Sequence, residues 1–99
     1  MPPVVYATTS FTELERFMAS TLCDQERMDV GQVKIRRTVM RQGTTVIGFV
    51  VRIEGPRLTR CHAIWAEREY RVLFYNSAGQ RFAVVKLAES PHLQGEIEG

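Results

Sequence analysis

Residues 32–87 read as five apolar runs with a period of two, and this pattern constrains the fold more than any other feature of the chain. Alternating apolar and polar residues are typical of strands that bury one face of a sheet. The breaks between runs contain turn-forming residues, among them Gly43, Gly55 and Gly79. We therefore expect this segment to form five antiparallel strands in a meander.

One helix is predicted ahead of the strands. Ser10 and Glu13 form a capping-box pattern, in which the Ser10 hydroxyl accepts a bond from the backbone three residues on and Glu13 reaches back. From Phe11 to Leu22 the apolar residues recur at helical spacing, so one stripe of the helix faces a core. The predicted fold class is α+β, with one N-terminal helix packed on one face of a five-stranded antiparallel meander sheet.

Length and composition indicate one domain. A chain of 99 residues with 44% hydrophobic residues is large enough for one core, and two domains would each lack one. We expect residues 1–99 to form a single domain with an ordered core over about residues 10–88, and residues 1–9 and 89–99 to be partly flexible.

The first hairpin decides whether its two strands share a buried face. A three-residue loop, Arg41-Gln42-Gly43, with Gly43 left-handed, places Ile35 and Val39 on the same side as Phe49 and Val51. A two-residue turn would send one set to the wrong side, because side chains alternate along a strand. We therefore predict the three-residue loop.

The later strands are predicted over residues 58–66, 70–75 and 81–87. A tight turn near Glu67 sets Trp65 opposite Tyr70 and Ala63 opposite Val72. The register of the third and fifth strands stays open at this point. In the third strand, a loop one residue longer would exchange one buried set for another: Cys61, Ala63 and Trp65 for Leu58, His62 and Ile64.

The sheet face without a helix combines apolar and basic residues. It is predicted to hold eight apolar side chains and six Lys or Arg, and an apolar patch of this kind marks a contact surface. In one interpretation two copies pack sheet to sheet, and in another the face binds single-stranded nucleic acid. In a third, the sheet closes over its own interior.

We favour the first interpretation: a non-enzymatic protein-interaction module, a homodimer or a subunit binding a protein partner. Its predicted interface comprises Val46, Val50, Arg52, Arg60, Ile64, Arg71, Leu73 and Tyr75. The nucleic-acid alternative uses Arg36, Arg52, Arg60, Arg71, Tyr75 and Phe82 on the same face.

Charge is segregated along the chain. Residues 31–87 carry a net charge of +8, whereas residues 1–30 and 88–99 each carry −3. Arginine outnumbers lysine eleven to two. The planar guanidinium suits phosphate binding, but a coding bias toward arginine explains the excess equally well.

No catalytic or cofactor motif is found, so we predict a protein that is not an enzyme and has no cofactor and no metal site. Cys61 and His62 are adjacent, but neighbouring strand residues point to opposite faces and do not form a nucleophile–base pair. Arg37 falls on the helix side; the open alternatives are pairing with Glu15 or Asp24, reaching solvent at the edge, or sitting beside a bulge.

The chain has no secretory-signal pattern at Met1-Pro2-Pro3, and its longest apolar run, residues 46–51, is too short to cross a membrane. Two cysteines are too few for a disulfide scaffold. We therefore expect a cytoplasmic protein with reduced cysteines and no membrane contact.

Overall fold

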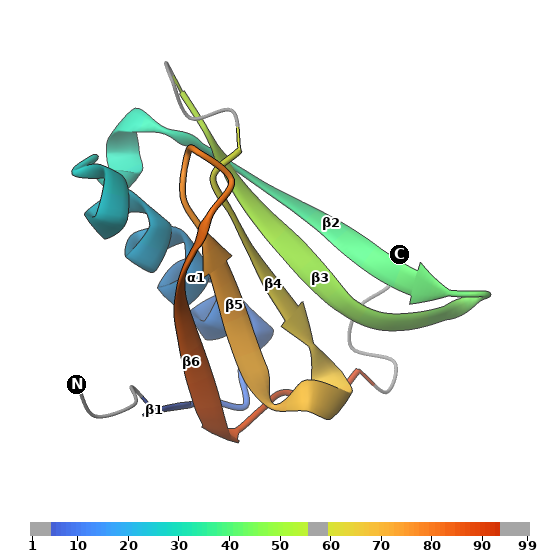
Figure 1. Ribbon diagram of the computed structural model, residues 1–99. Coiled ribbons are helices and arrows are strands. Elements are labelled where there is room, and N and C mark those ends of the chain that lie inside the picture. The colour runs from blue at the N-terminus through green and yellow to red at the C-terminus, as the bar shows by residue number, and fades with distance from the viewer. Residues whose placement is uncertain (1–4, 56–59, 94–99) are drawn as a thin grey trace.

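The computed structural model describes residues 5–55 and 60–93. Within these ranges, α1 (Phe11–Glu26) lies on one face of a six-stranded sheet, as Figure 1 shows. The strands are β1 (Val5–Ala7), β2 (Lys34–Gln42), β3 (Thr45–Glu54), β4 (His62–Ala66), β5 (Arg71–Tyr75) and β6 (Arg81–Glu89), and two short 3-10 helices are η1 (Val30–Gln32) and η2 (Glu67–Glu69). Their order in the sheet is β1-β6-β5-β4-β3-β2. The predicted α+β class is confirmed.

Strands β2 to β6 form the predicted antiparallel meander, and β1 adds a sixth strand parallel to β6. Tyr6 of β1 stacks on Phe17 of α1, with ring centroids 4.0 Å apart. At the other end of the described chain, Ser90 and Pro91 are buried. The packed structure thus extends past residues 10–88 on both sides. A three-residue strand is too short to show a period in sequence.

Helix α1 begins at the predicted cap, but its hydrogen bonds differ in one detail. The Ser10 hydroxyl accepts from the Glu13 backbone N–H at 3.2 Å, as expected. The expected bond from the Ser10 N–H to the Glu13 carboxylate is replaced by two bonds through Thr8. The Thr8 hydroxyl accepts from the Ser10 N–H at 3.1 Å and donates to the Glu13 carboxylate at 2.7 Å. The helix ends at Arg27, which is left-handed with φ 57°.

The core lies between α1 and the sheet. Leu14, Met18 and Leu22 of the helix are fully buried against Phe49 and Trp65 of the sheet. Burying a large apolar side chain contributes roughly 1.5–3 kcal/mol. The Trp65 indole N–H donates to the Ser90 hydroxyl at 2.9 Å, so the buried ring is also hydrogen-bonded.

The first hairpin reaches the predicted faces by a different route. Gln42 pairs with Thr45, so the loop is the two-residue turn Gly43-Thr44, with φ 64° at Gly43. The three-residue loop was therefore wrong. The register shifts between Met40 and Arg41, which leaves Ile47 as an extra residue in β3. This bulge restores the shared face, because one extra residue in a strand moves the register as one extra loop residue would.

The β4–β5 pairing is shifted by two residues from the prediction. Trp65 lies opposite Val72, and Ala63 lies opposite Phe74. The predicted tight turn was wrong, because η2 and a left-handed Tyr70 (φ 50°) lengthen the connection. A shift of two keeps every side chain on its face.

The open register of the third strand resolves in favour of the predicted buried set, Cys61, Ala63 and Trp65. The strand begins at His62, and residues 58 and 59 of its predicted span lie outside the described residues, as do Pro56 and Arg57 of the preceding turn.

Candidate interaction surface

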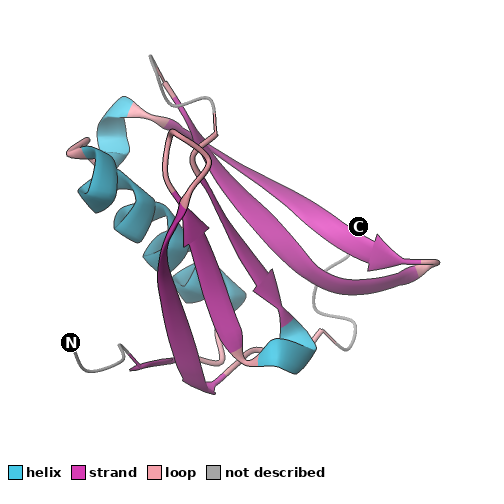
Figure 2. Ribbon diagram, in the orientation of Figure 1, coloured by secondary structure: helices cyan, strands magenta, loops and turns pink. Residues whose placement is uncertain are grey.

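The sheet face opposite α1 carries a row of residues that crosses five strands and is aliphatic on four of them. Within the described residues no helix lies over this face, as Figure 2 makes clear. Strand pairing sets one residue of each strand beside the next in what we name the central row: Thr38, Val50, Ile64, Leu73 and Val84. Val50, Ile64 and Leu73 are half-buried, and Val84 is 40% exposed. Four neighbouring aliphatic side chains are thus partly open to solvent.

A second row runs along one side of the central row. We name it the arginine row: Arg36, Arg52, His62, Tyr75 and Arg81. The His62 and Tyr75 rings are stacked, with centroids 4.6 Å apart and planes 7° from parallel. That separation matches the spacing of neighbouring strands, so both rings stand out from the sheet. The His62 Nδ1 lies 2.7 Å from the Arg60 carbonyl oxygen. A carbonyl oxygen can only accept, so the ring N–H is the donor, and this bond holds the ring in place.

A third row lies on the other side, and we name it the small-residue row: Met40, Gly48, Ala66, Arg71 and Lys86. Gly48 is required there, since a Cβ atom at this position would lie 2.0 Å from the Trp65 carbonyl oxygen. Ala66, directly beside it, adds only a methyl group. On β3 and β4, therefore, the residues of the small-residue row are smaller than Arg52 and His62 on the other side of the central row.

Two flanking arginines are neutralised within the chain. Arg36 Nε lies 2.7 Å from a Glu54 carboxylate oxygen, and Arg71 Nε lies 3.0 Å from Glu69. Such exposed pairs contribute about 0–1 kcal/mol to stability, but they reduce the net charge of the face. Arg52 forms no ion pair with any residue in the described ranges.

Most of the predicted interface residues lie together on this face: Val50, Arg52, Ile64, Arg71, Leu73 and Tyr75. The other two lie at opposite ends of the sheet. Val46 pairs with Arg41 next to the β2–β3 turn. Arg60 precedes β4, and its Cδ atom lies over Gly79 in the β5–β6 turn.

Phe82 was predicted on this face, and that placement was wrong. Tyr75 pairs with Arg81 while Phe74 pairs with Ala83, so Phe82 is the extra residue of a bulge. Its ring centroid lies 5.9 Å from that of buried Phe74, and it packs against the core. The preceding turn composition does not show where strand pairing resumes, and no sequence signal revealed this bulge.

Sequence reasoning also missed three members of the flanking rows: Gly48, Ala66 and Arg81. Pairing across strands, which a single sequence does not show, brings them to the central row. Within one strand, the alternation with buried Phe49 and Trp65 was the available signal for Gly48 and Ala66.

Cys61 and His62 point to opposite faces, as predicted. Cys61 is buried in the core, while His62 lies on the helix-free face. Burial raises the pKa of the Cys61 thiol to about 12, and the Glu26 carboxylate adds to the effect. The pKa of Cys23 is raised by burial and by Asp24 and Asp29. Both cysteines are free, and both remain protonated thiols at neutral pH.

Arg37 lies on the helix side, as predicted, and takes the first of its proposed roles. Its Nε atom is 3.7 Å from a Glu15 carboxylate oxygen, and its guanidinium lies 5.7 Å from the Phe49 ring centroid. The residue closes one edge of the core as a paired cation. It is not part of the helix-free face.

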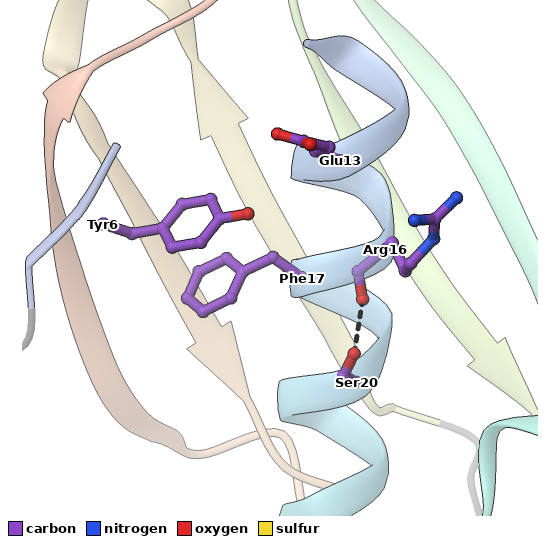
Figure 3. Close-up of a pocket in the computed structure, with 5 residues that line it drawn as sticks. All are labelled: Tyr6, Glu13, Arg16, Phe17 and Ser20. Carbon is purple, nitrogen blue, oxygen red and sulfur yellow. Dashed lines mark hydrogen bonds between the residues drawn. The ribbon is translucent and has the colours of Figure 1, made fainter. Parts of the chain in front are cut away.

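A hollow of about 330 Å³ lies beside α1, lined by Tyr6, Glu13, Arg16, Phe17 and Ser20. Figure 3 shows that the Arg16 guanidinium points away from Tyr6, so the polar groups do not converge. The Ser20 hydroxyl is already used, since it donates to the Arg16 carbonyl at 2.6 Å. This hollow therefore has weaker features of a binding site than the helix-free face.

In the described part of the chain, no three His, Cys, Asp or Glu side chains gather as metal ligands would. No helix there has the length and apolar character needed to span a membrane.

Over residues 5–55 and 60–93, the fold and this surface define an α+β protein whose sheet has a helix, α1, on one face only. Comparison of the chain with known proteins matched no family model, no curated protein and no solved structure.

Proposed function

We propose that this protein is a non-enzymatic interaction module that forms a homodimer through its helix-free sheet face. The observation that carries the proposal is the central row, in which Val50, Ile64, Leu73 and Val84 lie side by side and partly open to solvent. Patches of this kind mark contact surfaces. A second copy presents an identical row, so one packing buries both.

The face is large enough for a stable dimer. The six strands contain 41 residues in all, and about 3.3 Å per residue with about 4.8 Å between strands gives a face of roughly 650 Å². Each partner in a standard interface buries roughly 600–1,000 Å², so the face lies within that range. Most of its apolar side chains lie near its middle, as in stable interfaces.

The positive charge of the face is compatible with this partner. Arg36 and Arg71 are already paired with carboxylates of their own chain. The remaining cations lie outside the central row, where long side chains extend along apolar surface and keep their charged ends in water. Charge therefore affects the dimer at its rim, and apolar burial supplies the stabilisation.

The test is the mass in solution of the wild-type chain and of two variants. Light scattering should give a mass near twice 11.3 kDa for the wild type. Val50→Lys and Leu73→Lys should each give a folded monomer, because each places a charge in the centre of the interface. Val30→Lys is the matched control, since Val30 is an exposed apolar residue of η1 outside this face. A wild-type monomer at high concentration would overturn the proposal, as would unchanged assembly of both lysine variants.

Binding of single-stranded nucleic acid is the alternative on the same face. Arg52, which has no ion-pair partner among the described residues, favours it. Against it, Phe82 packs on the core and the Tyr75 ring is stacked on His62, so neither aromatic ring lies flat on the sheet for a base. A labelled single-stranded oligonucleotide that binds at micromolar protein, with an affinity that falls steeply as salt is added, would favour this alternative.

A further inference from the structure

We infer that the two copies are related by a two-fold axis that runs across the strands, along the central row, so that the arginine row of each copy lies over the small-residue row of the other. The inference rests on the proposed homodimer. It specifies which residues meet in the dimer.

Two orientations of the two-fold axis place the central row of one copy over the central row of the other. In a face-to-face dimer the two-fold axis lies in the plane between the sheets. It runs either along β4, parallel to the strands, or along the central row, perpendicular to them. The parallel axis places β2 over the partner's β6, and each row then lies over the same row of the partner. The perpendicular axis places each strand over the same strand of the partner. Each flanking row then lies over the other flanking row of the partner.

The parallel axis brings like residues together. It sets Arg36 over the partner's Arg81 twice, and it sets His62 over the partner's His62. The standing His62 ring then meets the same ring of the other copy, and Tyr75 lies over the partner's Arg52, so tall side chains oppose one another along this row. Arg36 is already paired with Glu54, so the main cost of this axis is steric.

The perpendicular axis fits the rows to each other in size. His62 then lies over the partner's Ala66, and Arg52 lies over the partner's Gly48. On β3 and β4 the larger residues of one copy thus meet the smaller residues of the other, and symmetry repeats this contact on both sides of the axis. Gly48 is held at minimal size by the fold itself, because a Cβ atom there would clash with the Trp65 carbonyl.

Charge does not distinguish the two axes, because each one opposes a single pair of basic residues and places Tyr75 over an arginine. With the perpendicular axis, Arg36 faces the uncharged Met40, and Tyr75 faces Arg71, which allows a cation–π contact. Only Arg81 and Lys86, both on β6, meet as like charges. That pair lies near an edge of the sheet, where solvent screens it.

Cysteine cross-linking distinguishes the two axes. Val84 and Thr38 are exposed and lie at opposite ends of the central row, four strand spacings or about 19 Å apart. With the perpendicular axis, Val84 faces the partner's Val84. With the parallel axis, it faces the partner's Thr38. The native cysteines are buried and protonated, so they react slowly with maleimides.

We expect Val84→Cys alone, and Thr38→Cys alone, to give cross-linked dimers with a short bismaleimide. Mixing the two variants should add no cross-link between them. Val30→Cys, exposed outside this face, is the matched control and should give only background. Two results would overturn the perpendicular axis without contradicting the dimer. One is a cross-link that forms only when the two variants are mixed, and the other is the absence of any cross-link in a protein that light scattering shows to be a dimer. A monomer by light scattering would overturn both.

Discussion

At the scale of single residues, the core contains two groups whose protonation is coupled to folding. Cys61 is the stronger case, because burial and the Glu26 carboxylate hold its pKa at about 12 against an ordinary value of 9.0. The folded state therefore keeps the proton over a pH range in which the unfolded chain releases it. The unfolded state then binds fewer protons, and stability decreases as pH rises.

We expect the ionisation of Cys61 to have no effect on the free energy of unfolding below pH 9. Between pH 9 and pH 12, the range set by the two pKa values, the free energy of unfolding should fall as pH rises. The slope attributable to Cys61 is at most about 1.4 kcal/mol per pH unit. Urea denaturation at stepped alkaline pH measures it, with Cys61→Ala compared to the wild type. Equal slopes for the two proteins would show that the thiol ionises freely in the fold.

At the scale of elements, the start of α1 depends on a short relay of polar groups. Ser10 caps the helix, and Thr8 connects the Ser10 N–H to the Glu13 carboxylate. The same relay lies directly after β1, so it also positions the strand that forms one edge of the sheet. The cap was evident in the sequence. The contribution of Thr8 became evident only in the structure.

Ser10→Ala should destabilise the protein by about 1 kcal/mol, because it removes the acceptor of a helix N-terminal N–H. Ser20→Ala on the same helix is the matched control. Its hydroxyl bonds the Arg16 carbonyl within the helix, and alanine has the higher helix propensity, so we expect little loss. Chemical denaturation of the three proteins measures the difference, and equal losses would contradict the capping role.

At the scale of the whole molecule, the sheet has one face covered by α1 and one that the proposed dimer covers. A protein stabilised by association has a melting temperature that depends on its concentration, because only the folded chain assembles. We expect the melting temperature of the wild type to rise with protein concentration, and that of Val50→Lys to stay constant. Calorimetry over a hundredfold concentration range, on the order of 1 to 100 times the dissociation constant, checks this. A constant wild-type value would contradict the dimer.

The elements of the fold were largely predictable from the sequence, because they depend on short-range patterns. The alternation over residues 32–87 identified the five strands of the meander, and Ser10 marked the helix start. Most of the helix-free face followed from the same alternation, since Val50, Ile64 and Leu73 each lie between buried neighbours in their own strands. These are local properties of the chain.

Only the tertiary structure decided which residues lie beside one another across strands. The bulges at Ile47 and Phe82, the longer β4–β5 connection and the added strand β1 all depend on pairing between distant segments. A strand has the same period whatever its register, so alternation determines which face a side chain takes but not which neighbour it meets. That is why the sequence determined the two faces of this sheet, while the arrangement of its central and flanking rows came from the fold.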